Sequence, residues 1–296
     1  MALSPEARRA VEHARGEPRV HAPGYDIAAA RVAARELALA EPPLELAEVR
    51  DLDADGVPVR LYRPADAAPG VVVHLHGGGF VFNDVEVHDR PCRRFAHGLG
   101  IAVLSVDYRL APEHRFPAAP DDVDTVLAWL EREASSLDLD GPAYAHGDSA
   151  GANLALVAAL RHPGRFRALV LHYPFLDPTA GFASYAEQAD TGFDPEEAAW
   201  YWRQYAASAA DLTDPDLAPL LSDRLGTLPP TLVTTAEHDP LRDEGERLVE
   251  LIGEAGGQAV GTRWLGQLHG FWRHRQVFPA ADQLMAQGAS FIRSHA

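Results

Sequence analysis

Short apolar runs separated by longer mixed segments dominate the chain from residue 70 onward. Such uninterrupted runs are typical of strands that are buried on both faces of a parallel sheet. The segments between them are long enough for crossover helices. The pattern therefore predicts an α/β fold with a mostly parallel central sheet flanked by helices. The runs are GVVVHLH (70–76), IAVLSVDY (101–108), GPAYAHGD (141–148), ALVLHYPFL (168–176) and PTLVTTAEHD (230–239).

The first 64 residues follow a different pattern. Segments 4–16 and 26–40 are rich in alanine, and their composition and periodicity predict two helices. Alternating apolar and polar residues over 44–64, around the turn DADG at 53–56, predict an antiparallel hairpin. The apolar residues that fall on one side of the second helix are Ile27, Ala30, Ala34 and Leu37.

The segment 179–215 interrupts this alternation of strands and helices. It has no strand pattern, and it carries the aromatic residues Trp200, Tyr201, Trp202 and Tyr205. A helical insertion of this kind suits a cap over a pocket, and ordinary packing between helices is the alternative. Beyond it, the pattern predicts a helix over 243–256, a strand over 258–265 and a closing helix over 276–294. We find no repeat and no linker, so residues 1–296 are predicted to form one domain.

Composition and charge exclude several classes of function. The 296 residues carry a formal net charge of -17, which disfavours nucleic acids and anionic membrane surfaces as partners. Cys92 is the only cysteine, so no intrachain disulfide can form. The first residues have no apolar core of the kind found in signal peptides, and no run is long enough to span a membrane. We therefore expect a soluble, cytoplasmic protein.

A serine lies between a predicted strand and a predicted helix. Residues 147–151 read GDSAG, which fits the motif G-x-S-x-G of a strand-to-helix turn that exposes a nucleophilic serine. A pentapeptide of this kind also occurs by chance, but here a strand ends before it and an alanine-rich helix follows. The alternative is an ordinary turn capped by Asp148 or Ser149. The context favours Ser149 as a nucleophile.

Three consecutive glycines end the strand at 70–76. In HGGG (76–79), Gly77 and Gly78 can bring their amides close to a substrate oxygen, where any Cβ would collide. Together with the amide of Ala150, which follows the serine, they are predicted to form an oxyanion hole. The alternatives are a loop that only turns the chain, or a phosphate-binding loop. No phosphate-binding glycine motif is present.

The remaining catalytic groups are expected downstream of the serine, in the order acid and then histidine. Asp239 ends the strand over 230–239, and His269 follows the strand over 258–265, so both lie where parallel strands end. His238, His274 and Asp243 are the rivals. His238 is adjacent to Asp239 and could not easily face it. His274 lies at a helix start, and Asp243 lies in the first turn of a predicted helix, where acids are favoured by the helix dipole alone.

A zinc site is the main alternative use of the histidines. His74 and His76 are close in sequence, but no H-E-x-x-H motif and no cysteine–histidine cluster accompany them. We therefore predict no metal and no cofactor.

With these motifs the chain resembles the bacterial hormone-sensitive-lipase-like esterases of the α/β-hydrolase fold. The resemblance covers nearly everything from residue 70 onward. It is carried by HGGGFV (76–81), DYRLAPEHRFPAA (107–119), GDSAGANLA (147–155), YPFLD (173–177), AEHDPLRDEGE (236–246) and HGF (269–271). Ala152 stands where the family usually has another glycine, inside the predicted helix.

The resemblance implies a catalytic triad of Ser149, Asp239 and His269, with Gly77, Gly78 and Ala150 as the oxyanion hole. It implies that 107–113 braces the glycine loop, and that segments 1–45 and 179–215 form a helical cap. The residues that we expect to contact substrate are Phe80, Trp200, Trp202 and Phe271.

The function that follows is hydrolysis of short- to medium-chain carboxylic esters through an acyl-enzyme intermediate. The expected partner is a small ester, and the family resemblance allows a homodimer. One alternative is a pathway enzyme for a natural product, such as an acyltransferase, dehydratase or cyclase. Another is a ligand receptor without catalysis, against which the presence of His269 argues.

Overall fold

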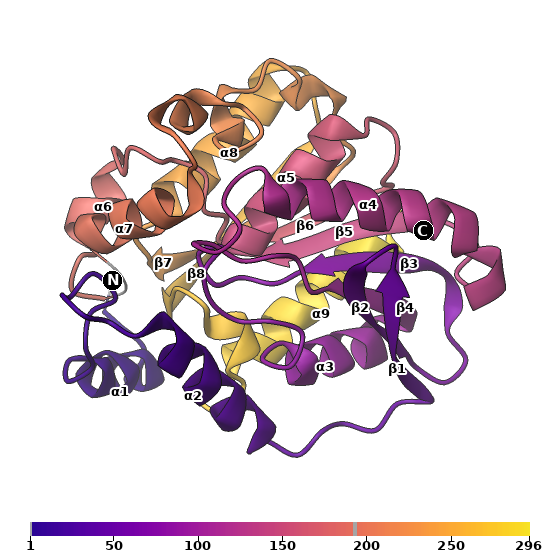
Figure 1. Cartoon of the computed structure of the whole chain (residues 1–296), viewed down its shortest axis with the longest axis horizontal. Helices are drawn as coiled ribbons and strands as arrows, with labels where there is room; N and C mark the ends of the chain where they lie inside the picture. The colour runs from indigo at the N-terminus through magenta and orange to yellow at the C-terminus, as the bar shows by residue number, and fades with distance from the viewer. Residues whose placement is uncertain (1, 192–193) are drawn as a thin grey trace.

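Eight strands form one sheet in the order β1-β2-β4-β3-β5-β6-β7-β8 (Figure 1). The computed structural model describes residues 2–191 and 194–296. β1 pairs with β2 and β2 with β4 in antiparallel fashion, and the other neighbours are parallel, which confirms the predicted sheet and hairpin. The strands are β1 (Glu48–Ala54), β2 (Val57–Arg63), β3 (Ala68–Leu75), β4 (Ile101–Val106), β5 (Ala143–Asp148), β6 (Leu169–His172), β7 (Thr231–His238) and β8 (Ala259–Leu268).

Helices cover both faces of the sheet (Figure 1). Buried residues of α4, α5 and α8 share one core cluster with Val71 and Val73 of β3. Buried residues of α3 and α9 share the other cluster with Val72, because successive side chains of a strand point to opposite faces. These helices are α3 (Asp89–Leu99), α4 (Ala118–Glu133), α5 (Ala150–Arg161), α8 (Arg242–Glu254) and α9 (Ala280–Arg293).

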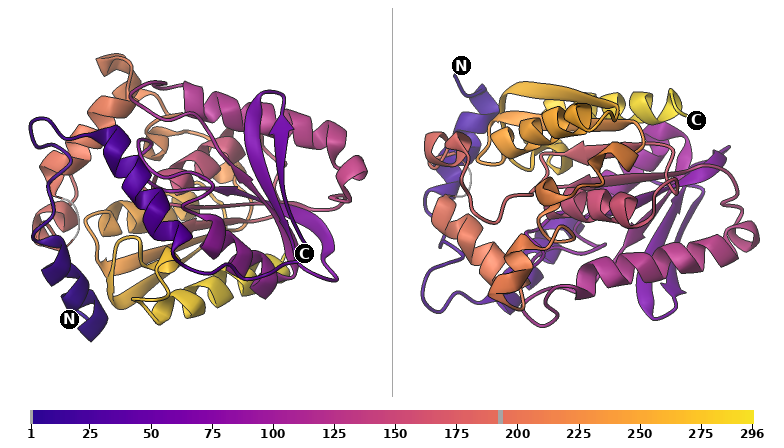
Figure 2. Two further views of the ribbon diagram at one scale, coloured as in Figure 1. Left: turned by 60° about the horizontal axis from the view of Figure 1, so that its bottom comes forward. Right: turned by 90° about the horizontal axis from the view of Figure 1, so that it is seen from above.

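Four further helices gather at one end of the molecule (Figures 1 and 2). They are α1 (Pro5–Ala14), α2 (Ile27–Leu39), α6 (Ala183–Glu187) and α7 (Pro195–Tyr205). Within 179–215 the described residues form helices and no strand, as predicted; residues 192 and 193 of this segment, like residue 1, lie outside the described residues. Single turns of 3₁₀ helix complete the chain at Ser135–Leu137, Ala209–Thr213, Pro219–Leu221, Leu225–Thr227 and Phe271–Arg273.

The apolar side predicted for α2 is only partly covered: Ile27 is half-buried and packs against the core, and Ala30 and Ala34 are half-buried. No residue of α2 is buried, and the side chain of Leu37 is 74% exposed. Two arginines add polar contacts: Arg35 pairs with the carboxylate of Asp84, and Arg31 reaches two main-chain oxygens. Arg31 donates from Nε to the carbonyl oxygen of Val81 and from Nη2 to that of Ala111, both at 2.8 Å. The helix is therefore fixed to two loops of the sheet by polar contacts.

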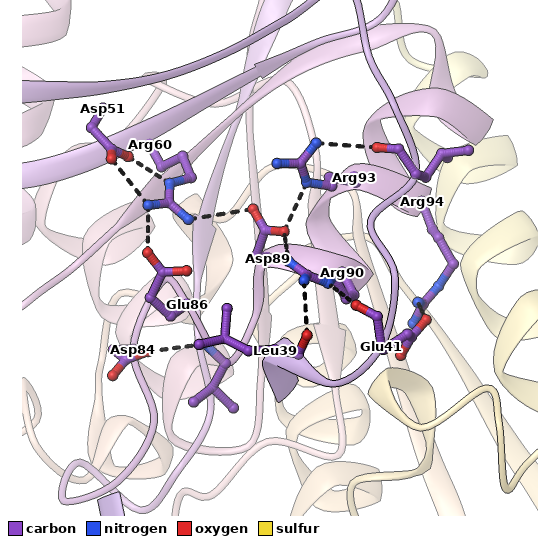
Figure 3. Close-up of polar contacts among 12 residues, drawn as sticks. Leu39, Glu41, Asp51, Arg60, Asp84, Glu86, Asp89, Arg90, Arg93 and Arg94 are labelled. Atoms are coloured by element: carbon purple, nitrogen blue, oxygen red, sulfur yellow. Dashed lines mark hydrogen bonds and ion pairs between the residues drawn. The ribbon is translucent and has the colours of Figure 1, made fainter. Parts of the chain in front are cut away.

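A network of arginines and carboxylates joins the hairpin to α3 and to the segment after α2 (Figure 3). Arg60 of β2 pairs with Glu86 at 2.6 Å and reaches the buried carboxylate of Asp89 at 3.4 Å. Arg93 also pairs with Asp89, at 2.7 Å. Arg94 binds the carboxylate of Glu41 at 2.7 Å. A buried carboxylate is tolerated here because several guanidinium groups surround it.

No helix in the described ranges is both long and apolar enough to cross a membrane.

Candidate active site

Ser149 lies in the turn between β5 and α5, with φ 55° and ψ -121°. The glycines on either side are needed because a Cβ at Gly147 would collide with the backbone of Gly151, and one at Gly151 with the carbonyl of Leu75. The amide of Ser149 donates to the carbonyl oxygen of His172 at 2.9 Å. The predicted strand–turn–helix is therefore present, in the strained form that exposes a nucleophile.

Three side chains from separate loops contact one another in series. Nε2 of His269 lies 3.0 Å from Oγ of Ser149, and Nδ1 of His269 lies 2.9 Å from Oδ2 of Asp239. Asp239 follows β7, and His269 follows β8, so the parallel sheet brings both to the edge where β5 ends. The structure thus brings together all three residues of the predicted triad.

The surroundings of the acid and the base fix their orientation. Asp239 is fully buried, and its second oxygen, Oδ1, accepts the amide of Leu241 at 2.8 Å. The imidazole of His269 is 18% exposed and lies edge-on to the ring of Tyr173, with centroids 4.8 Å apart. These contacts leave only the Nε2 side of the imidazole facing the serine.

The rival residues have other partners. Nδ1 of His238 lies 3.2 Å from Oε1 of Gln188. Asp243 pairs with Arg242 and accepts the amide of Ser184 at 2.9 Å. His274 is exposed.

The glycine loop differs from the sequence-based prediction at Gly77. Its amide donates a hydrogen bond of 2.8 Å to Oδ1 of Asp148, and it is not available to a substrate oxygen. The amides of Gly78, Gly79 and Ala150 have no acceptor in the part of the chain that the structure describes. Gly78 and Gly79 also line the cavity at Ser149. This hydrogen bond contradicts the prediction of Gly77 as an oxyanion donor, and the amide of Gly79, which the prediction did not include, is open at the cavity instead.

Residues 107–113 hold the glycine loop, as expected from the family resemblance. The hydroxyl of Tyr108 donates to the carbonyl oxygen of His76 at 2.6 Å, and its ring stacks on the His76 ring. The amide of Ala111 donates to the carbonyl oxygen of Phe80 at 2.9 Å. Nδ2 of Asn83 donates to the carbonyl oxygen of Gly77 at 2.9 Å.

A cavity of about 130 Å³ opens at the serine and the imidazole. Its volume is below the range of typical ligand pockets, which begins near about 300 Å³. Its lining combines the two loop glycines with polar and aromatic side chains. The lining residues are Gly78, Gly79, Asn83, Asp148, Ser149, Phe175, Tyr201, His269, Gly270 and Arg273.

The comparisons with known proteins agree with this geometry. The family model described as "alpha/beta hydrolase fold" matches residues 72–273. The ethyl acetate hydrolase of Pseudomonas putida is 33% identical over 82% of this chain and 80% of its own length. A solved esterase from the bacterial hormone-sensitive lipase family superposes with a TM-score of 0.88 at 28% identity, covering 100% of this chain and 99% of its own. The chain belongs to the hormone-sensitive-lipase-like esterases of the α/β-hydrolase fold. This chain is also similar to a hyperthermophilic esterase from Pyrobaculum calidifontis, with a TM-score of 0.91 and 36% identity, and the match covers 99% of both chains.

The aromatic residues predicted to contact substrate do not line the cavity of the esterase. Phe80, Trp202 and Phe271 are almost fully buried. Phe80 stacks on Tyr205 with ring centroids 3.8 Å apart, and Trp202 packs on Phe175. Phe80 and Trp202 belong to the core cluster that also contains Phe175, and Phe271 belongs to the cluster on the opposite face of the sheet.

The fourth residue, Trp200, is also outside the cavity lining. Its ring stacks on Phe82, with centroids 6.2 Å apart. The rings that line the cavity are Phe175 and Tyr201. Tyr201 covers Gly79 so closely that a Cβ at this glycine would collide with the tyrosine ring.

Five buried histidines lie on the other side of the nucleophile turn. The ring of His74 lies beside those of His88 and His146, with centroids 5.6 and 5.0 Å apart. The five histidines are His74, His76, His88, His146 and His172.

Burial controls the charge of these groups. It lowers the pKa of His74 and of His146 well below the ordinary value and lowers the pKa of His172 to about 4. Burial alone would raise the pKa of Asp148, but the charge and hydrogen bond of His88 outweigh it and lower that pKa. The lowered pKa values favour the neutral imidazole at His74, His146 and His172, close to the carboxylate of Asp148.

Proposed function

We propose that the esterase cleaves small carboxylic esters through an acyl-enzyme on Ser149. His269 accepts the serine proton as Oγ attacks the ester carbonyl, and then passes that proton to the departing alcohol. The same imidazole then activates water for deacylation. Asp239 holds the imidazole with Nε2 toward the serine. The observation that carries the proposal is the continuous contact from Ser149 to His269 at 3.0 Å and from His269 to Asp239 at 2.9 Å.

The amides of Gly78, Gly79 and Ala150 are proposed to hold the oxyanion. Two of them belong to a loop that side chains of other segments brace, so the donors are in place before the substrate arrives. Preorganised donors of this kind stabilise the charge that develops in the transition state. Ala150 supports the assignment because it is the first residue of α5, where the helix leaves the amide without an internal partner.

The acyl group is proposed to be short to medium in length. A cavity of about 130 Å³ at Ser149 suits a small acyl group. A second cavity of about 560 Å³ shares Asn83 and Arg273 with the first, and Leu37 and Val277 contribute apolar surface to it. This neighbouring space supports longer chains. We place the cap in segments 1–45 and 179–215, because α2 lines the second cavity and Tyr201 of α7 lines the first.

Labelling with a fluorophosphonate tests the nucleophile. One equivalent of reagent should attach to Ser149, and Ser149→Ala should remove both labelling and the acylation burst. Ser136→Ala is the matched control, because Ser136 is an exposed serine bonded within its own turn. Turnover by Ser149→Ala within tenfold of wild type would refute the assignment.

A panel of p-nitrophenyl esters from acetate to decanoate tests the substrate class. Hydrolysis should be fastest for the short and medium chains. A labelled Ser149 without hydrolysis of any short ester would favour a specialised pathway enzyme, such as an acyltransferase, dehydratase or cyclase. Failure of labelling would favour a receptor without catalysis.

Cytoplasmic localisation and homodimer formation stay predictions. β8 ends the sheet, and two of its apolar side chains, Val260 and Leu265, are 52% and 53% exposed, which supports pairing of two copies at this edge. Light scattering on the purified protein measures the mass, and cell fractionation measures the localisation.

A further inference from the structure

Three of the buried side chains behind Ser149 are arranged as metal ligands. His74 at the end of β3, His88 just before α3 and Asp148 at the end of β5 each offer a ligand atom, and these atoms lie within 4.8 Å of one another. His74 and His88 are fully buried, and Asp148 is 3% exposed. We propose that His74, His88 and Asp148 bind a divalent first-row transition-metal ion such as Zn²⁺. This site goes beyond ester hydrolysis and uses none of the proposed triad.

The separations suit a small cation. Zinc binds imidazole nitrogen and carboxylate oxygen at about 2.0–2.2 Å. Nε2 of His88 lies 3.2 Å from Oδ1 of Asp148. Two ligands separated by 3.2 Å subtend an angle of about 100° at an ion about 2.1 Å from each, which is close to tetrahedral geometry. Any two ligands of a tetrahedral ion with this radius lie about 3.4 Å apart, so the most widely separated pair of atoms must close by up to about 1.4 Å when the ion binds.

Two ring nitrogens in this cluster have no hydrogen-bond partner among the residues that the structure describes. They are Nε2 of His74 and Nδ1 of His88, and both are buried. A buried polar atom without a partner has a cost of about 1–3 kcal/mol. Coordination of His74 through Nε2 removes that cost for one ring. The unpartnered Nε2 of His74 is the observation that distinguishes the cluster from a satisfied hydrogen-bond network.

Neighbouring groups orient the ligands as outer-shell residues do in metal sites. Nδ1 of His74 lies 2.8 Å from Nδ1 of His146, and a proton on the His74 side leaves Nε2 with a free lone pair. The amide of Gly77 donates to Oδ1 of Asp148 at 2.8 Å and fixes that carboxylate. These two contacts therefore fix the orientation of the His74 ring and of the Asp148 carboxylate.

The donor set selects the kind of metal. Two imidazoles and one carboxylate suit zinc, iron or cobalt, whereas magnesium and calcium prefer oxygen ligands alone. Asp148 also lines the cavity at Ser149, so an ion can enter from the substrate side. Ligands from three distant segments explain why no sequence motif predicts this site.

Zinc binding to the full-length protein tests the proposal. After treatment with EDTA and dialysis, wild type should bind one equivalent of Zn²⁺ with an increase in Tm of about 5 °C at one hundred times the Kd. Crystals soaked with ZnCl₂ should show an anomalous peak between His74, His88 and Asp148. His74→Gln should weaken binding by more than about 100-fold, since even outer-shell changes weaken it by about 10–100-fold.

Two control variants separate this site from others. His162 lies 2.7 Å from Asp124 at the surface, so His162→Gln removes a competing surface pair and should leave the interior site unchanged. Ser149→Ala should bind Zn²⁺ like wild type, even if the proposed esterase mechanism is wrong. Anomalous peaks at the surface only, or tight binding retained by a folded His74→Gln, would overturn the proposal. The soaked wild-type crystal gives an answer even if that variant fails to fold.

Discussion

The amide of Gly77 donates a hydrogen bond of 2.8 Å to the carboxylate of Asp148, the residue just before the nucleophile. This contact joins the glycine loop to the turn that carries Ser149. The position of Gly78 and Gly79 relative to the serine therefore depends on a bond that neither of them makes.

Gly77→Ala should damage catalysis through this contact. A Cβ at residue 77 would lie 2.5 Å from Oδ2 of Asp148 and 2.8 Å from its carbonyl oxygen, so the loop must move away. We expect kcat to fall by about 10²–10³, as when an oxyanion donor is lost. Gly253→Ala is the control, because nothing lies within 4 Å of an added Cβ in that helix. Equal activity of both variants would contradict the role of the contact.

Asp239→Asn should lower kcat by about 10⁴, because the amide no longer holds the imidazole in the productive tautomer. Steady-state and burst kinetics with a p-nitrophenyl ester measure the effect. Asp243→Asn is the matched control, since Asp243 contacts Arg242 and Ser184 and not the imidazole. A larger loss in the control than in Asp239→Asn would show that the wrong acid has been chosen.

Much of this arrangement could be predicted from sequence. Buried parallel strands need continuous apolar runs, and their ends must meet at one edge, which is why the sequence alone predicts that Ser149, Asp239 and His269 lie together. The sequence does not show which glycine amides are free to bind the oxyanion. Gly77 and Gly79 look the same in the sequence, and only the three-dimensional position of Asp148 shows which amide is already bonded.

The aromatic residues show the same limit. Phe80, Trp202 and Phe271 are as apolar as a pocket lining requires, but such side chains are equally suited to a core. In the structure all three are buried in the core. On α2, Leu37 lies on the predicted apolar side of the helix with Ile27, but its side chain is exposed. Helical periodicity predicts which side of a helix is apolar, but it does not predict which other element packs against that side.

Tyr201→Ala should shift chain-length preference toward longer acyl groups. Its ring lines the cavity and covers Gly79, so its removal enlarges the space beside Ser149. Each methylene that gains apolar contact is worth about 1–3 kcal/mol, or about 10–200-fold in kcat/KM. The ester series from acetate to decanoate measures the shift. Trp200→Ala, outside the cavity lining, should leave the preference unchanged.

Glu197→Gln should change the pH dependence of stability. Burial raises the pKa of Glu197, against the opposing effect of Arg19. A raised pKa in the folded state means that the stability of the wild type is fully present below about pH 4.5 and is lost as pH rises through the folded pKa. The Tm of the variant relative to wild type should therefore increase from pH 4 to pH 8. A difference that stays constant, or that decreases with pH, would contradict this assignment.

Arg31 fixes α2 by donating to the main-chain oxygens of Val81 and Ala111. Because every residue type supplies such an oxygen, these two contacts survive substitutions in either loop, whereas the pairs of Arg31 with Glu113 and of Arg35 with Asp84 depend on those carboxylates. The helix itself buries no side chain, so most of its positions are under little packing constraint. α2 lines the second cavity and carries none of the triad residues. Substitutions on this helix should therefore change the shape of that cavity without touching the triad, and selectivity can be redesigned there first.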